Sequence, residues 1–342
     1  MMKRQLASNQ NRRYSAADIE QLRQITRAAR LHLIQGARQT EIAEKMGISQ
    51  AGVSRLLKMA EEQGIIRSIV VPPEGLYPDL EEALVETFGI EAAYVIDVDP
   101  AENAVSQTLG SAAARCLDDF LDNGPAVGFT SWSTTLREMA SVLEPRRSGI
   151  KHVVETLGDL GSPMLQHEAD VATLQMAQAF RAEAVFLRAP GVMHSKDLHK
   201  AALADIHVQR ALTLLDHLDT VFVGIGPADF HGPLEENDNF FTAEQLAEVR
   251  KAGAVGQLHQ RFIDSDGNPV KTPLDDLVIG LSLDQLRNAG RRIAVAGGTA
   301  KHEALAAALK GKWIDVLVTD AGSANALLSG AATAPRHMKG KS

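Results

Sequence analysis

The chain has 342 residues, enough for a small domain plus a larger one of roughly 250 residues, with 45% hydrophobic and 23% charged residues as in globular proteins. Its single cysteine, Cys116, excludes an intrachain disulfide framework and a cysteine-based zinc site, and 4% aromatic residues argue against base-stacking surfaces for single-stranded nucleic acid. No apolar run approaches the roughly 20 residues that span a bilayer and no signal peptide is recognisable, so we expect a cytoplasmic protein without a membrane partner.

The net charge of −8 is unevenly distributed along the chain. Residues 1–75 hold 12 Lys and Arg against 7 Asp and Glu, a net charge of +5, so the remainder carries −13. A basic segment attached to an acidic body is typical of proteins whose nucleic-acid contacts are confined to one domain. Chance segregation of charge could produce the same distribution, so the choice between it and a DNA-binding segment depends on sequence motifs.

Residues 1–14 are polar and aperiodic, which predicts a flexible arm. A winged helix-turn-helix domain is predicted over 15–71, and a linker rich in proline over 72–78. The expected elements of that domain are helices over about 15–34, 39–46 and 49–63, followed by a strand over 65–71 that would form the wing.

The window from Gln39 to Lys58 reads QTEIAEKMGISQAGVSRLLK. Ala43 permits two helices to cross closely, Gly47 permits positive φ at the turn, and Ser49 is a good N-cap for the second helix. The residues expected to contact DNA are Ser49, Gln50, Ala51, Gly52, Ser54, Arg55 and Lys58. Gln can bond adenine, Arg can bond guanine, and Lys suits phosphates. Apolar spacing alone would equally fit an ordinary helical hairpin.

Residues 79–330 alternate apolar, β-rich runs with helical segments, which predicts a doubly wound α/β domain with a parallel sheet covered on both faces. Residues 331–342 are predicted to be a disordered tail. The strands are expected at 93–98, 126–129, 152–156, 184–187, 221–225, 277–281, 293–296 and 316–319. The helices are expected at about 80–88, 101–121, 170–181, 203–215, 243–251 and 301–310.

Ligands of parallel sheets bind at the carboxyl ends of strands, beside helix N-termini. After the strand at 126–129 comes a hydroxyl-rich turn, in which Thr130, Ser131, Ser133 and Thr134 suit a phosphate or sugar hydroxyls. Simple capping of the next helix needs only one such hydroxyl, so we favour ligand binding.

Three further strand ends carry weaker signals. Gly226 belongs to a Gly-x-Gly pair that permits close backbone approach or merely a tight turn, and it lacks the third glycine of a dinucleotide fingerprint. Gly297 and Gly298 precede Lys301, which could meet an anion or a carbonyl carbon, or simply be a surface lysine. Asp320 could bond sugar hydroxyls or cap the next helix.

Enzymatic motifs are weak in this sequence. It contains no His-Glu-x-x-His or Gly-x-Ser-x-Gly motif and no P-loop spacing, and its histidines are scattered. The pairs Asp97 with Asp99 and Asp229 with His231 could serve acid–base chemistry, but solvated loop residues are the favoured interpretation. We therefore expect no catalytic residue, no metal site and no cofactor.

Several blocks, taken in order, resemble the SorC family of bacterial sugar-responsive regulators over roughly residues 25–330. They are RLHLIQGARQTEIAEKMGISQAGVSRLLKMAEEQGII, GFTSWSTTL, VFVGIGP, GAVGQLHQRFIDSDG, AVAGGTAKHEALAAALKG and VLVTDAGSANALL.

The resemblance implies a winged reader joined to an effector domain similar to sugar-phosphate isomerases and deaminases. It implies that Thr130, Ser131, Ser133 and Thr134 cradle a phosphate and that Gly297, Gly298, Lys301 and Asp320 belong to the same site. Two departures from the family pattern stand out: Ser131-Trp132-Ser133 stands in place of Gly-Trp-Gly, and Gln257 stands where relatives often carry Asp. Phosphorylated and unphosphorylated effectors therefore both stay open.

The sequence therefore predicts a repressor-type transcriptional regulator, not an enzyme. As a homodimer or homotetramer it would bind double-stranded operator DNA under the control of a sugar, polyol or sugar phosphate. One alternative is a phosphosugar-processing enzyme with a DNA-binding arm. Another is a DNA-binding protein whose larger domain only oligomerises.

Overall fold

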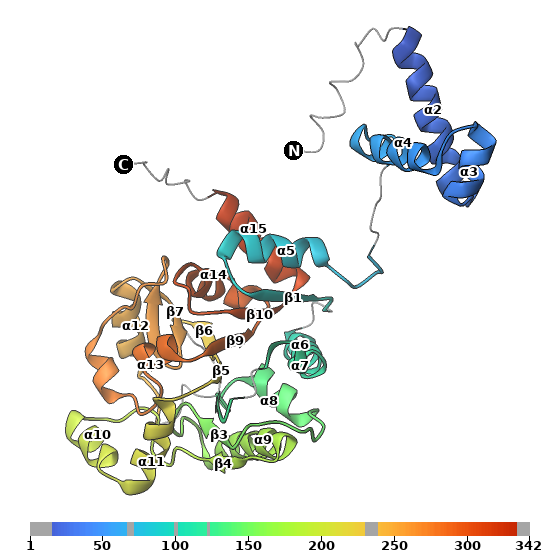
Figure 1. Cartoon of the computed structure of the whole chain (residues 1–342). Coiled ribbons are helices and arrows are strands. Elements are labelled where there is room, and N and C mark those ends of the chain that lie inside the picture. Colours follow the sequence, from blue (N-terminus) through green and yellow to red (C-terminus); the bar gives the residue numbers. More distant parts are fainter. Residues whose placement is uncertain (1–15, 67–71, 99–101, 122–123, 230–238, 334–342) are drawn as a thin grey trace. The chain divides into compact units, whose positions relative to one another are not determined.

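A computed structural model describes residues 16–66, 72–98, 102–121, 124–229 and 239–333 (Figure 1). The chain divides into two compact units, Met1–Val71 and Pro72–Ser342, each of which is described by itself. The division coincides with the start of the predicted linker at residue 72. In the described part, no helix combines the length and the apolar character needed to cross a membrane.

The smaller unit contains α2 (Ala16–Leu33), α3 (Gln39–Met46) and α4 (Gln50–Glu62), close to the predicted helices. Its core is formed by small and branched side chains that recur at helical spacing. These buried residues are Ile25, Ala28, Ala29, Ala37, Ile42, Val53, Leu57 and Ala60. The predicted wing strand at 65–71 lies mostly outside the described residues, and Ile65 and Ile66 are not in a strand.

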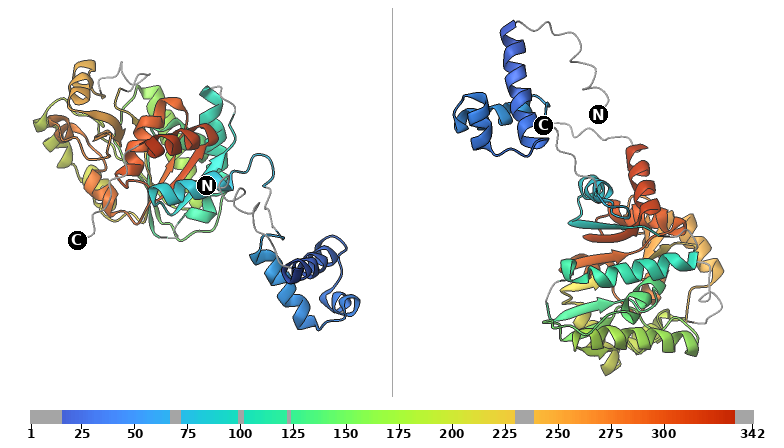
Figure 2. Two further views of the ribbon diagram at one scale, coloured as in Figure 1. Left: turned by 90° about the horizontal axis from the view of Figure 1, so that it is seen from above. Right: turned by 90° about the vertical axis from the view of Figure 1, so that its right-hand side faces the viewer.

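The larger unit is built on a parallel sheet. In the described part of the chain, seven strands are ordered β1-β10-β9-β5-β2-β3-β4, and each neighbouring pair is parallel (Figures 1 and 2). The strands are β1 (Ala92–Ile96), β2 (Ala126–Phe129), β3 (His152–Glu155), β4 (Glu183–Val185), β5 (Thr220–Phe222), β9 (Arg291–Val295) and β10 (Val316–Asp320).

Helices pack on both faces of this sheet, because the strand side chains alternate between two separate apolar cores. One core joins the sheet to α6–α9, and the other joins it to α5, α11 and α13–α15 (Figure 2, right). Their bounds are α5 (Pro78–Phe88), α6 (Glu102–Arg115), α7 (Leu117–Phe120), α8 (Thr134–Ser141), α9 (Pro163–Phe180), α10 (Lys196–Leu203), α11 (Ile206–Leu215), α12 (Ala243–Lys251), α13 (Leu283–Asn288), α14 (His302–Lys310) and α15 (Ala321–Thr333). The expected doubly wound architecture is confirmed.

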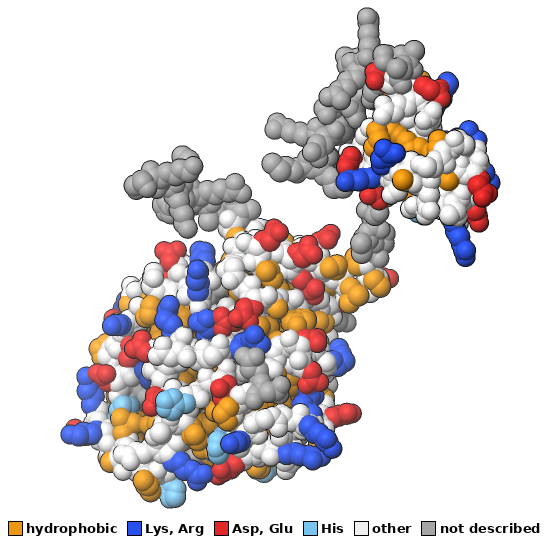
Figure 3. Space-filling model, in the orientation of Figure 1, with side chains coloured by type: hydrophobic (Ala, Val, Ile, Leu, Met, Phe, Trp, Pro, Cys, Tyr) orange, Lys and Arg blue, Asp and Glu red, His pale blue; other side chains and the backbone are white. Residues whose placement is uncertain are grey.

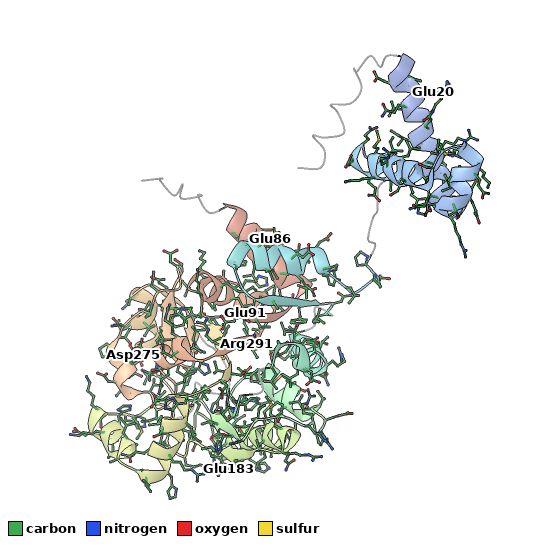
Figure 4. The ribbon with its side chains drawn as sticks, viewed as in Figure 1. Glu20, Glu86, Glu91, Glu183, Asp275 and Arg291 are labelled. Carbon is green, nitrogen blue, oxygen red and sulfur yellow. The ribbon has the colours of Figure 1, made fainter. Side chains whose placement is uncertain are left out.

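Charged side chains brace the amino ends of the strands. Arg291 at the start of β9 pairs with Glu91, which precedes β1, at 3.0 Å (Figure 4). Arg210 on α11 similarly donates to Glu183, the first residue of β4, at 2.7 Å. These ion pairs lie at the opposite end of the strands from the carboxyl ends, where parallel sheets usually bind ligands, so we interpret their role as structural.

A second sheet was not predicted. The strands β6 (Ile225–Pro227), β7 (Ala254–Leu258) and β8 (Arg261–Asp264) form an antiparallel sheet in the order β6-β7-β8. The predicted strand at 221–225 is therefore divided between two sheets. Its single apolar run hid the break after Phe222, where Gly224 lets the chain turn away from the parallel sheet.

The strand predicted at 277–281 is wrong. Thr272 caps a short 3-10 helix, η1 (Pro273–Leu277), and the following residues make only isolated bridges, from Val278 to Val192 and from Gly280 to Leu157. A buried apolar run without a ladder partner has the same appearance in sequence as a strand.

Several other helix boundaries in the structure differ from the predicted ones. The helix predicted from 170 begins at Pro163, and α10 was not expected. Pro78, assigned to the linker, is the first residue of α5, as its fixed φ allows. Residues 331–333, assigned to the tail, are the last turn of α15, and residues 334–342 lie outside the described part.

Candidate DNA-reading helix and effector pocket

The helix-turn-helix has the geometry that its sequence predicted. Gly47 adopts φ 69° at the turn, a conformation that favours glycine. The Ser49 hydroxyl then accepts a hydrogen bond from the N–H of Gly52 at 3.1 Å, which caps α4. Ile42 and Val53 are fully buried between the two helices.

The predicted DNA-contacting residues share one outward face of α4. Gly52 is half-buried against the Ser49 cap. The exposed members are Ser49, Gln50, Ala51, Ser54, Arg55 and Lys58. Among the described residues, Arg55 donates only to the carbonyl of Ala51, and Lys58 lies 3.9 Å from Glu62 in an exposed pair. Such exposed contacts contribute little, so both cations can turn toward another partner. Figure 3 shows Lys and Arg side chains on the visible face of this unit.

A cavity of about 220 Å³ opens in the larger unit where β2, β3 and β5 end. This is the crevice where the chain order of the sheet reverses around β2, the usual ligand position in open α/β sheets. Its described lining residues, hereafter the effector pocket, are Ser106, Thr130, Trp132, Ser133, Thr134, Leu157, Gly224, Ile225, Gly226, Pro227, Gln257, His259, Gln260 and Lys301.

The pocket brings together five of the nine residues predicted to bind effector. These are Thr130, Ser133, Thr134, Gly226 and Lys301. Ser131 is buried beneath the turn, where its carbonyl accepts a hydrogen bond from Arg137. The remaining three do not line the cavity: Gly297 and Gly298 lie in the loop between β9 and Lys301, and Asp320 is the last residue of β10.

Hydrogen bonds join this loop to the end of β10. The N–H of Gly298 donates to the Asp320 carboxylate at 2.8 Å and to the Ser323 hydroxyl at 3.0 Å. Burial alone would raise the pKa of Asp320, but hydrogen bonds from Ser323 and Gly298 lower it overall. A side chain at Gly297 would meet the Asp320 carboxylate at 2.1 Å, so only glycine fits. Asp320 therefore holds the loop that leads to Lys301.

A hydrogen-bond network that the sequence analysis missed lies under the pocket. The hydroxyl of Thr130, at the end of β2, lies 2.7 Å from the hydroxyl of Thr156, which follows β3. Nδ1 of His259 lies 2.9 Å from the first and 3.1 Å from the second. The N–H of Gly224, after β5, donates to His259 Nε2 at 3.4 Å. One imidazole thus joins three strand ends.

This network fixes the ionisation of His259. Because Nε2 accepts from a backbone N–H, the proton of a neutral ring sits on Nδ1 and is donated to the threonine hydroxyls. The ring is 2% exposed, and burial, with a smaller contribution from the charge of Arg261, lowers the pKa of His259 from its usual 6.5 to about 3. His259 is therefore a neutral structural partner at physiological pH.

His259 and Gln260 form the two-residue turn between β7 and β8, with φ of 48° and 63°. Two successive non-glycine residues at positive φ are strained, and such strain concentrates at functional sites. The turn lacks the Asn-Gly or Gly-containing pair that marks this hairpin in sequence, which explains why the hairpin and its pocket residues were missed. Arg261, next along, donates to carbonyls of Asp275 and Val278 and anchors the turn (Figure 4 labels Asp275).

Lys301 ends a short 3-10 helix, η2 (Thr299–Lys301), ahead of α14. Burial lowers the pKa of its ammonium, and in the described part of the chain it forms no hydrogen bond or ion pair. The lining residues described contain no carboxylate that could pair with it. A half-buried, unpaired cation calls for an anion supplied from outside.

The candidate acid–base pairs lie outside this pocket or outside the described residues. Asp97 is exposed beyond β1, and Asp229 is exposed with its carboxylate 4.0 Å from Arg250. Asp99 and His231 are not among the described residues. The described residues contain no group of three or more His, Cys, Asp or Glu side chains placed to bind a metal ion.

Comparison with known proteins agrees with both halves of this description. A family model of a sugar-binding domain, Sugar-bind, matches residues 76–329, and a winged helix-turn-helix DNA-binding model matches residues 35–67. The chain belongs to the SorC family of sugar-binding transcriptional regulators. Its fold, DNA-reading domain and regulator class are therefore as the sequence predicted.

The curated relatives are named as regulators, and their similarity to this chain covers nearly their whole length. The deoxyribonucleoside regulator of Bacillus subtilis is 29% identical, over 88% of this chain and 96% of the relative. The transcriptional regulator LsrR of Escherichia coli is 31% identical, over 89% and 94%. The crystal structure of the full-length sorbitol operon regulator SorC from Klebsiella pneumoniae aligns with a TM-score of 0.69 and 26% identity, over 90% of this chain and 99% of that one. This SorC-family chain is likewise a transcriptional regulator and not an enzyme.

Proposed function

We propose that this regulator binds operator DNA through α4 and that a small carbohydrate carrying an anionic group binds in the effector pocket and alters its DNA affinity. The observation that carries the proposal is Lys301, a cation in the pocket with no partner among the described residues. An anion beside it would restore the pKa that burial lowers, and this gain contributes to binding.

A second contribution to anion binding comes from the turn after β2. Thr134 is exposed at the first position of α8, where free backbone N–H groups and the helix dipole favour an anion. Ser133 adds a hydroxyl, and Thr130 lines the pocket while its own hydroxyl bonds Thr156 and His259. The cavity, about 220 Å³, is smaller than the roughly 300–1,000 Å³ of drug-sized ligand sites, which suits a small sugar derivative. Relatives named for sorbitol and for deoxyribonucleosides support a carbohydrate or carbohydrate derivative as effector.

On DNA, we assign base contacts to Gln50 and Arg55 and phosphate contacts to Lys58. Ser49, Ala51, Gly52 and Ser54 complete the contact face. A reader that presents one helix per chain binds a two-fold operator as a dimer or tetramer, and DNA access implies the cytoplasm.

The test measures affinity for DNA flanking the coding sequence by fluorescence anisotropy, with and without sugars, polyols and their phosphates. We expect an anionic member to change the affinity, and Lys301→Met to remove the response while leaving DNA binding intact. Lys200→Met, at an exposed lysine on α10, is the matched control and should respond as wild type. An unchanged response in Lys301→Met would overturn the assignment of the pocket.

A further inference from the structure

Gln257, on β7, holds its side-chain amide in a fixed orientation. Its Oε1 accepts a hydrogen bond from the backbone N–H of Gln260 at 2.8 Å, so the amide cannot turn over without losing this bond. Nε2 is therefore directed away from the turn and packs against Gly226, where an added Cβ would approach it to 2.7 Å. In the described part of the chain, Nε2 has no hydrogen-bond partner, and Gln257 lines the effector pocket.

The wall around Gln257 is rich in donors and positive charge. Gln257 and Lys301 line the same pocket, and β6, which carries Gly226, is in contact with η2, which carries Lys301. Trp132 adds an indole donor, and the hydroxyls donate or accept. Carboxylates, which commonly accept from sugar hydroxyls, are absent from the described lining residues.

We propose that Gln257 is a specificity residue and that the effector presents an acidic end to it, making the effector a phosphorylated sugar acid. The hydroxyl-rich turn and the start of α8 take one anionic group, and the Gln257 amide with Lys301 takes the second. This inference rests on the proposed effector role of the pocket. From the neutral Gln257 amide, a hydroxyl end would receive only a neutral hydrogen bond, whereas a carboxylate receives a charge-assisted bond that is roughly twice as strong and also pairs with the Lys301 ammonium.

The experiment compares ligands that differ only at this end. 6-Phospho-D-gluconate and D-sorbitol 6-phosphate share six carbons and a phosphate and differ in a carboxylate against a CH₂OH. Shorter pairs extend the series. The five-carbon pair is ribonate 5-phosphate with ribitol 5-phosphate, and the four-carbon pair is erythronate 4-phosphate with erythritol 4-phosphate. Dissociation constants are measured by calorimetry on the full chain. We expect an acid to bind about tenfold or more tightly than its alcohol partner, as one charge-assisted bond implies.

The deciding variant is Gln257→Glu. The substitution preserves the side-chain length and the oxygen that accepts from Gln260 N–H. It replaces the Nε2 amide donor with a negatively charged oxygen. Acid binding should fall at least tenfold in this variant, and the alcohol partner should become the tighter ligand. Gln178→Glu, the same change at an exposed position on α9, should keep the wild-type preference. If Gln257→Glu does not fold, Gln257→Met should bind both members equally.

Two outcomes overturn the inference. One is an alcohol that binds as tightly as its acid partner, and the other is failure of every acid to bind. Operator binding, recorded in parallel, separates this inference from the proposed function. If the phosphate of a sugar alcohol, or another sugar phosphate without a carboxylate, alters DNA affinity through Lys301, the proposed function stands and the sugar-acid effector is refuted. If no carbohydrate alters DNA affinity, the proposed function fails as well.

Discussion

Replacing His259 with asparagine should remove a specific pH dependence of stability. Asn tolerates positive φ, here 48°, and its amide can donate to the threonine hydroxyls as Nδ1–H does. It does not titrate, and it loses the bond from Gly224 N–H. At pH 7.5 we expect the free energy of unfolding to be about 1–2 kcal/mol lower in His259→Asn, from this lost bond and the smaller side chain.

The pH effect follows from the lowered pKa. In the unfolded chain His259 binds a proton near pH 6.5, whereas in the native state it stays neutral down to about pH 3. Stability is therefore fully present above pH 6.5 and falls as the pH drops toward 3, because only the unfolded state gains the proton. Between pH 7.5 and 5.0 the wild type should lose about 2 kcal/mol through this group, at roughly 1.4 kcal/mol per pH unit below 6.5.

The measurement is urea unfolding of wild type and His259→Asn at several pH values, with the difference taken at each one. Other titrating groups are common to both proteins and cancel in the difference. We expect the wild-type advantage at pH 7.5 to vanish or reverse by pH 5.0. A difference that stays constant across this range would show that the buried ring is not held neutral, and the network assigned to it would be wrong.

Three further changes test separate parts of the structure. Arg55→Ala should weaken operator binding at least tenfold and relax specificity at one base pair. A binding-site selection measures this specificity, and recovery of the unchanged wild-type motif would contradict the assignment. Ser49→Ala should lower the stability of the DNA-reading unit by about 1 kcal/mol through loss of the α4 cap, seen in thermal unfolding; no loss would mean that the cap is dispensable. Gly297→Ala should destabilise the larger unit by about 2 kcal/mol or more and abolish effector binding, since its Cβ would collide with Asp320; a normal calorimetric titration would contradict the packing.

The predictable parts of this protein are those whose signals are local. Gly47 and Ser49 mark a turn and a cap within a few residues, so the reader could be located without its partners. The hydroxyl run from Thr130 to Thr134 marks the strand end in the same way, because a phosphate-binding turn needs hydroxyls and N–H groups from contiguous residues.

The parts that were missed depend on contacts distant in sequence. His259 reaches Thr130 across 129 positions and Thr156 across 103, and its turn carries no glycine. Gln257 was noticed only as a departure from the SorC pattern, and its free amide became visible through the bond to Gln260. Asp320 was placed in the pocket because it ends a strand, whereas its carboxylate is occupied by its own neighbours.

The most direct test of effector control joins the pocket and the operator in one titration. Trp132 lines the pocket, and the other tryptophan, Trp313, is 1% exposed in the core, so a fluorescence change that is lost in Trp132→Phe reports pocket occupancy. With labelled operator present, the same sample gives DNA binding by anisotropy. We predict that both signals change with one midpoint and that Lys301→Met removes both, as linkage requires. A carbohydrate that alters operator binding while Trp132 fluorescence stays unchanged would contradict the account.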